Sequence, residues 1–467
     1  MGVQSDLHAH LFLKNFLMAS AALKVPLVSK FGFGVGDLAF NLIWQGTALF
    51  LMYFYTDVLG ISAGVAGLIY LVSMIWDAVT DPIMATLADR TETRIGKFRP
   101  YILFGALPLA LSYPLAFSSS PITTIPVEAW ALLTHLILRT AYTVVGVPFS
   151  SLQARLTDDA QERTVLAGFR MVGAASGGLT VVFLTPVLLG FFGPEQESLA
   201  FISAASIAGC IVLIALLYCG LVMREPERPR QVQTGSFMDD LKSVIPMFIA
   251  NPPLIRVFAI IITSSVCLAM FGKNTIYFFK YELERPDLTL WALVTPAAML
   301  LLCVPFWVWL AGRRSKRDAL LLGGSIGLIG YLVFFCFANI SVAYAFAAIV
   351  LIGIGGSALP VMFWSMLPDT VEYGELKSGR RSEAKIFGFA TFAQKAAIGL
   401  NALILGLLLD GVGFTPNVDQ TEFALLGIRS VMALVPAAGA CLILVLALGY
   451  RLDRLEHARL VEELRRS

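Results

Sequence analysis

Long apolar segments alternate with short polar connections along the whole chain. About twelve of them reach the roughly 20 residues that cross a bilayer core as a helix. These segments span approximately residues 27–56, 64–88, 99–118, 126–154, 163–192, 198–223, 252–281, 287–311, 317–338, 341–367, 382–412 and 424–450. The pattern predicts an all-α membrane protein with twelve transmembrane helices.

A polar stretch, REPERPRQVQTGSFMDDLKS, separates the first six apolar segments from the last six. The chain is therefore expected to form two pseudo-symmetric six-helix bundles, residues 27–223 and 252–450, joined by a cytoplasmic linker over residues 224–251. Residues 1–26 would form a cytoplasmic leader without an assigned role, and residues 451–467 a cytoplasmic tail.

Lys and Arg gather in alternate loops, which the positive-inside rule places in the cytoplasm. Such loops follow the second, eighth and tenth segments, at Arg90, Arg313 and Lys377, whereas only Lys280 and Arg285 interrupt the pattern on the other side. Both termini are therefore predicted to be cytoplasmic. The expected location is a cell inner (plasma) membrane, crossed many times.

Composition excludes several classes of function. Hydrophobic residues make up 57% of the chain, charged residues 14%, and the mean hydropathy is +0.78. The basic residues are spread over loops and form no nucleic-acid-binding patch. The six cysteines show no C-x-x-C spacing, and phosphate-binding and nucleophile motifs are absent from the sequence. We therefore expect no enzyme activity, cofactor, obligatory protein partner or metal site other than one for a coupling cation.

Two acids, Asp77 and Asp81, stand in the apolar run IWDAVTDP. An ionised side chain inside a bilayer costs at least a few kcal/mol, so such residues are candidates for function. At positions i and i+4 both carboxylates share one helix face, where they would repel. A shared cation or proton would remove the repulsion. Alternatively, one acid caps a helix and the other pairs with a basic residue.

The linked motifs YTDVLG, WDAVTDP, DRTETRIGKFRP and LPDTVEYGELKSGRRSEAKIFGFATFAQK resemble those of the glycoside-pentoside-hexuronide:cation symporter family. The melibiose permeases belong to this family, which is part of the major facilitator superfamily. The resemblance implies the major facilitator fold. It also implies import of a sugar or glycoside, coupled to sodium or protons by alternating access.

The same resemblance implies roles for individual residues. Asp37 matches a carboxylate that accepts sugar hydroxyls, Arg170 an arginine near the sugar, and Lys395 a lysine near the cation-binding acids. The implied cation-binding residues are Asp77, Thr80, Asp81 and Thr143. Gly146 and Ser150 replace a second sugar-binding Asp and a stacking Trp, so the substrate is not expected to be a galactoside.

Segment 126–154 carries a polar stripe at helical spacing, formed by His135, Arg139, Tyr142, Thr143 and Gly146. Arg139 offers a planar fork of donors that suits an anionic group. One interpretation is that Arg139 and Arg170 favour an acidic substrate such as a uronide. The other is that Arg139 pairs internally with Asp37.

Lys273 and Lys395 are the main positive charges within the second half. Lys395 would lower the proton affinity of the two helix acids, whereas Lys273 is expected to extend to the membrane surface. Trp44, Tyr142 and Trp364 are candidate stacking surfaces for a sugar, although membrane aromatics also serve plain packing.

Two charged loops at equivalent places in the halves suggest a gate. Their residues are Asp89, Arg90, Arg94, Lys97, Asp369, Glu372, Arg380 and Arg381. Ion pairs across these loops would close the cytoplasmic side. The alternative is that the basic residues only set topology, which leaves the acids unexplained.

Two other functions remain open on the same fold. A cation-coupled lysophospholipid symporter would also keep the helix acids and use Arg139 and Arg170 for a phosphate headgroup. A non-transporting ligand sensor is the second alternative, although loss of Asp77 and Asp81 would be its expected signature.

Overall fold

A computed structural model describes residues 25–120, 124–156, 160–223, 251–378 and 383–450, together with residues 225, 248, 452, 456, 459 and 463. Twelve long helices lie within this described part of the chain. They are α2 (Leu27–Tyr53), α3 (Ala63–Arg90), α4 (Arg99–Ala116), α5 (Val127–Leu156), α6 (Ala160–Phe192), α7 (Glu197–Val222), α9 (Pro252–Tyr277), α10 (Thr289–Arg313), α11 (Lys316–Phe337), α12 (Val342–Ser378), α13 (Glu383–Gly411) and α14 (Glu422–Leu448). The predicted all-α fold is confirmed.

Local sequence signals account for several helix starts. The side chains of Ser62, Ser315 and Thr421 accept hydrogen bonds from backbone N–H groups in the first turns of α3, α11 and α14. Asn251 caps α9 in the same way and is followed by proline at the first helical position. Such residues satisfy N–H groups that have no partner inside the helix.

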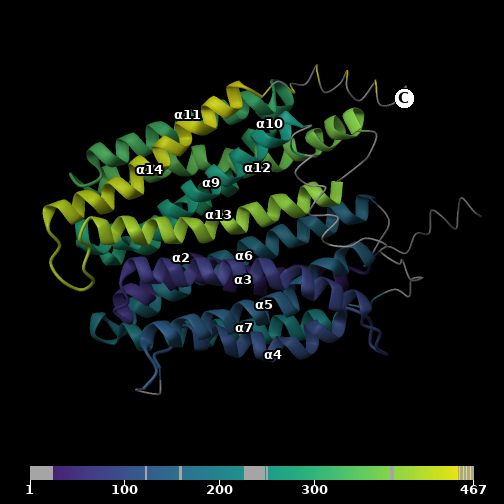
Figure 1. Cartoon of the computed structure of the whole chain (residues 1–467), viewed down its shortest axis with the longest axis horizontal. Helices are drawn as coiled ribbons and strands as arrows, with labels where there is room; N and C mark the ends of the chain where they lie inside the picture. Colours follow the sequence, from purple (N-terminus) through teal and green to yellow (C-terminus); the bar gives the residue numbers. More distant parts are fainter. Residues whose placement is uncertain are drawn as a thin grey trace, which may run out of the picture.

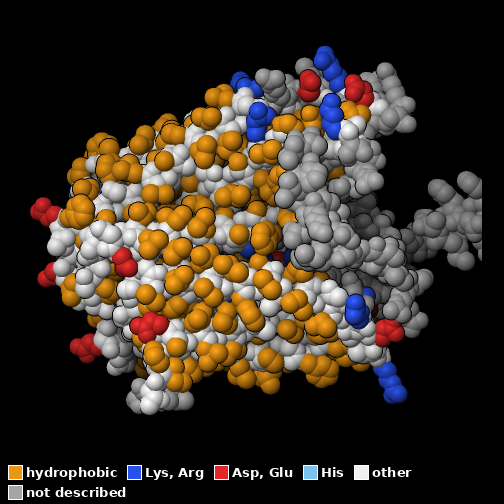
Figure 2. Space-filling view, in the orientation of Figure 1, with side chains coloured by type: hydrophobic (Ala, Val, Ile, Leu, Met, Phe, Trp, Pro, Cys, Tyr) orange, Lys and Arg blue, Asp and Glu red, His pale blue; other side chains and the backbone are white. Residues whose placement is uncertain are grey.

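The outer surface is apolar over most of its height (Figure 2). Within the described residues, eleven helices are long and apolar enough to cross a membrane. The exception, α4, has 18 residues and includes Arg99, Pro108 and Pro114. Its flanks are covered by α5 and α7. On the face shown in Figure 2, exposed Lys and Arg lie at the right-hand end and several acids at the left-hand end.

The helices form two bundles that run side by side (Figure 1). Helices α2 to α7 pack with one another, as do α9 to α14, and the halves meet chiefly along α3 and α13. Helices α2 and α9, and α6 and α10, also touch across the interface. We call the end at which α7 ends and α9 begins the linker end, and the opposite end the far end.

Glycines bring α3 and α13 into backbone contact toward the far end. A Cβ atom on Gly406 would overlap the Ala63 carbonyl oxygen, and one on Gly67 would lie 2.5 Å from that of Ala402. Only a residue without a side chain fits such an approach. The two halves are therefore closely joined at the far end.

We expect Gly406→Ala to destabilise the protein, because the added methyl group clashes with the α3 backbone. Overpacking of this kind costs roughly 1–3 kcal/mol. The measurement is the apparent melting temperature of the purified protein in detergent. Gly411→Ala is the matched control, since it lies on the same helix with open space around its Cβ position. Equal melting temperatures for the two variants would contradict the close packing.

Candidate functional site

A cluster of charged side chains joins the two halves between α3 and α13. The Lys395 ammonium donates to Asp77 Oδ2 at 2.9 Å and to Asp81 Oδ2 at 2.6 Å. The Thr143 hydroxyl of α5 lies 2.9 Å from both Asp77 Oδ1 and Asp81 Oδ1. The two acids therefore share both partners, as the spacing of four residues predicts. We call these four side chains the acid pair cluster.

The charges of this cluster do not cancel when its groups are ionised. Two carboxylates and one ammonium leave a net charge of one negative unit. Asp77 has no exposed side-chain surface, whereas Lys395 and Asp81 expose 20% and 29% of their side chains, so water screens the cluster only in part. Thr143 has one hydroxyl proton and cannot donate to both acids at once. One further cation, or one proton on a carboxyl group, would neutralise the cluster. It would also satisfy the contact between Thr143 and the carboxylate to which its hydroxyl does not donate.

Thr80, the remaining predicted cation ligand, is oriented differently. Its hydroxyl contacts the backbone carbonyls of Trp76 and Asp77 at 2.9 and 3.2 Å, within its own helix. The structure does not bring the Thr80 hydroxyl into the acid pair cluster.

Asp37 forms a second ion pair, inside the first half. Arg170 on α6 donates to Asp37 Oδ1 through Nε at 3.1 Å and Nη2 at 2.9 Å. Asn41 donates to the other carboxylate oxygen at 3.3 Å. The alternative in which Arg139 pairs with Asp37 is therefore wrong, because Arg170 on the neighbouring helix occupies that carboxylate. Arg170 is itself compensated and adds little positive charge to the site.

Arg139 lies among aromatic rings and a histidine. Its Nε donates to His135 Nε2 at 3.3 Å, and its guanidinium lies 5.2 Å from the centre of the Trp44 ring. Trp44 in turn contacts Tyr142, at 6.1 Å between ring centres. Trp44 and Tyr142 are half-buried, so their rings remain partly accessible next to the acid pair cluster.

The prediction that Lys273 extends to the membrane surface is wrong. Lys273 exposes only 1% of its surface, and its ammonium sits 3.6 Å from the centre of the Tyr70 ring on α3. The ammonium points into the interface between the halves. From the sequence alone, a lysine near the end of a membrane helix can point to the membrane surface or into the protein. The neighbouring helices decide which direction it takes.

The remaining predicted substrate residues are spread over the linker-end half of the site. Gly146 lies beside Phe40 and Tyr142, where an added Cβ would be 3.3 Å from the Phe40 ring. Ser150, one turn further along α5, is exposed. Trp364 on α12 stacks on Phe387 of α13, at 6.2 Å between ring centres, and no described contact joins it to Trp44.

The predicted gating residues are described only in part. Asp369 accepts from the Lys316 ammonium at 2.7 and 2.8 Å, within the second half. Glu372 and Lys97 are half-buried, and Arg90 and Arg94 are exposed. The side chain of Asp89 and the whole of Arg380 and Arg381 lie outside the described residues. A gate across these loops stays a prediction.

A network that was not predicted from the sequence closes the far end. The Lys280 ammonium donates to Asp57 Oδ1 at 3.0 Å, to the Tyr53 hydroxyl at 2.6 Å and to Asn417 Oδ1 at 2.8 Å. The Tyr281 hydroxyl also donates to Asp57. Asp57 has no exposed side-chain surface. We call these five residues the far-end lock, because they connect both halves.

The far-end lock follows the two-fold relation of the halves. Helices α2 and α9 both end at a tyrosine and continue as short π-helical turns, η1 (Phe54–Val58) and η3 (Phe278–Glu282). Tyr53 of the first half bonds Lys280, and Tyr277 of the second bonds Thr56 at 2.7 Å. Lys280 and Thr56 occupy the same position in their turns. The available signal was the pair of related segments FYTDV, which carries an acid, and FFKYE, which carries a lysine.

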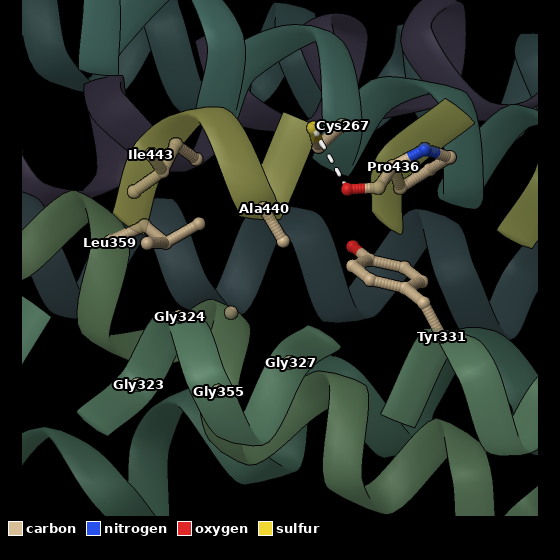
Figure 3. Close-up of a pocket in the computed structure, with 11 residues that line it drawn as sticks. Cys267, Gly323, Gly324, Gly327, Tyr331, Gly355, Leu359, Pro436, Ala440 and Ile443 are labelled. Atoms are coloured by element: carbon tan, nitrogen blue, oxygen red, sulfur yellow. Dashed lines mark hydrogen bonds between the residues drawn. The ribbon is translucent and has the colours of Figure 1, made fainter. Parts of the chain in front are cut away.

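Two cavities lie away from the acid pair cluster. The first, among Cys267, Gly323, Gly355 and Tyr331 of the second half, is apolar and has a volume of about 10 Å³, room for about one water molecule (Figure 3). The second opens at the far end beside Glu282 and has a volume of about 530 Å³. The first is a packing gap between glycine-rich helices and cannot hold a sugar.

Comparison with known proteins identifies the family. A family profile described as MFS/sugar transport protein matches residues 32–454. The uncharacterised symporter YnaJ of Bacillus subtilis is 32% identical over 94% of this chain and 95% of its own length. The isoprimeverose transporter of Lactiplantibacillus pentosus is 29% identical over 94% of this chain and 91% of its own. These relatives are transporters, and the prediction that the chain is not an enzyme is confirmed.

A solved structure shows the same fold. The nucleoside transporter NupG superposes with a TM-score of 0.62, covering 90% of this chain and 98% of NupG. Their sequences are 14% identical, so this likeness concerns the fold alone.

We expect Lys280→Gln to open the far end, because it leaves the buried Asp57 carboxylate without its cation. Removing one partner of a buried ion pair costs roughly 3–5 kcal/mol. The measurement is labelling by a membrane-impermeant thiol reagent of a Thr275→Cys variant without the native cysteines, since Thr275 is buried near the far end of α9. Lys280→Gln should speed the labelling at least ~10-fold.

Arg285→Gln is the matched control for this prediction. Arg285 is the other basic residue of the same loop, but its partner is the exposed Asp287, and water screens such surface pairs so that they contribute little. Equal labelling rates for the Lys280 and Arg285 variants would show that the lock does not hold the halves together.

Proposed function

Because the chain belongs to the glycoside-pentoside-hexuronide:cation symporter family, we propose that it couples sugar or glycoside import to the inward movement of one cation, sodium or a proton. The acid pair cluster carries this proposal. Its net negative charge, its burial and its unsatisfied contact at Thr143 all suit one additional positive charge. Asp77, Asp81 and Thr143 would supply oxygen ligands, which suit a hard cation.

Lys395 would link cation binding to movement. It reaches from α13 of one half to two acids on α3 of the other, so it holds the halves together where the coupling charge would bind. An incoming cation competes with the ammonium for the same carboxylates and weakens that bond. Coupling requires only that cation and sugar each raise the affinity for the other.

The sugar would bind next to the acid pair cluster. The half-buried Trp44 and Tyr142 offer apolar faces, and Asp37 with Arg170 offers acceptors and donors for hydroxyl groups. Such a combination of aromatic surface and few polar groups is typical of small-molecule sites. Since Lys and Arg gather in the loops of the linker end, we place that end in the cytoplasm, with the described conformation closed on the outside.

The test is uptake into proteoliposomes of neutral glycosides, uronides and lysophospholipids, under a sodium gradient and separately a proton gradient. We expect one sugar class to accumulate under one gradient. Asp77→Asn and Asp81→Asn should each lower gradient-driven uptake at least ~100-fold, since each removes a charge from a buried ion pair. Asp287→Asn is the control, because this acid is exposed, and should leave uptake unchanged.

Three outcomes would contradict the proposal. Accumulation of lysophospholipid alone would assign the protein to lipid transport. Full gradient-driven uptake by the Asp77 and Asp81 variants would place the coupling site elsewhere. Specific sugar binding without any uptake would indicate a sensor.

A further inference from the structure

Three hydrogen-bond donors gather around Tyr70 without an anion. The Lys273 ammonium of the second half lies over the Tyr70 ring at 3.6 Å. His135 contacts the edge of the same ring, at 5.0 Å between ring centres, and Arg139 donates to His135. All three side chains are at least nine-tenths buried, and the nearness of Arg139 and Lys273 makes them repel.

Two donors of this group lack acceptors. Lys273 Nζ and His135 Nδ1 are buried without a hydrogen-bond partner. Because His135 Nε2 accepts from Arg139, the proton of the neutral ring belongs on Nδ1, which is then a donor. Among the described residues, Arg139 forms no ion pair with an acid. A buried polar group without a partner is costly, so its presence needs an explanation.

None of the nearby carboxylates has a described contact with these donors. Asp37 is bound by Arg170 and Asn41, and the acid pair by Lys395 and Thr143. Tyr142 lies near Asp37, both acids of the pair and Arg139. A positive group around Tyr70 thus lies on the far-end side of the negative acid pair cluster.

We propose that Arg139, His135 and Lys273 bind the oxyanion of an acidic sugar, a carboxylate or a sulfonate. This proposal rests on the proposed function and names its substrate class. Arg139 projects toward Trp44, where the sugar would lie, and its planar fork fits an oxyanion. Lys273 comes from the other half and parts from Tyr70 when the far end opens.

A site shared by both halves gives the anion a role in the transport cycle. With the far end closed, Lys273 and Arg139 lie near each other, and no described carboxylate pairs with either. An anion carried between them would remove their repulsion and stabilise closure around the substrate. A neutral sugar would leave the repulsion in place, and closure would then be disfavoured.

The experiment compares uptake of matched methyl glycosides in the gluco, galacto and manno series. Each is supplied as the neutral sugar, the uronide and the 6-sulfo-6-deoxy sugar, under the two cation gradients. Because hydrogen bonds to charged groups are stronger than those between neutral groups, wild-type kcat/KM should favour an acidic member at least ~10-fold over its neutral counterpart. The uronide and sulfonate arms show which oxyanion is preferred.

Lys273→Met and Arg139→Gln should each reduce this ratio of acidic to neutral uptake at least ~10-fold while uptake of either member still depends on the cation gradient. Lys273→Met should also raise the apparent melting temperature of the empty protein, because it removes a buried charge without a partner. Ser265→Ala is the control on the same helix, since its hydroxyl bonds only the Ile261 carbonyl, at 2.7 Å. It should leave the ratio unchanged.

The outcomes separate the two proposals. Gradient-driven uptake that prefers neutral sugars, or a ratio unchanged in both variants, would overturn the anion site and leave the symporter intact. Uptake of acidic sugars without dependence on either gradient would overturn the coupling and keep the anion site. Uptake of no sugar by the folded protein would overturn both.

Discussion

The bond between Lys395 and the acids Asp77 and Asp81 is the interaction on which the arrangement of the halves depends. It crosses the interface in a partly screened environment, where a single charge has a large effect. One ammonium cannot neutralise two carboxylates, so the same bond that joins the halves leaves room for another cation. A structural contact and a coupling site are thereby combined in one cluster.

The far-end lock complements this cluster. Its pair Tyr53 with Lys280 and the separate pair Tyr277 with Thr56 are related by the two-fold symmetry of the fold, so both halves contribute equivalent turns to one seal. Glycine contacts between α3 and α13 bring the backbones together on the same side. Because a packed interface changes between discrete arrangements, the lock and the acid pair cluster would open and close as units.

Negative and positive side chains form two separate groups within the site. Asp77 and Asp81 make the acid pair cluster negative, while Lys273, His135 and Arg139 form a positive group around Tyr70. A cation and an acidic sugar would each meet the opposite charge, with Tyr142 near both groups. Neutralising both groups together lowers the cost of closing an apolar cavity around charged side chains.

The sequence by itself determined the membrane class, the number of long helices and the pairing of Asp77 with Asp81, because hydropathy and helical spacing are local properties. Resemblance of motifs correctly placed Thr143 and Lys395 beside those acids. Only the tertiary structure decided which arginine binds Asp37, the inward direction of Lys273 and the lock around Asp57. These contacts join residues far apart in the chain, and partner choice depends on how neighbouring helices rotate and cross, which no single helix encodes.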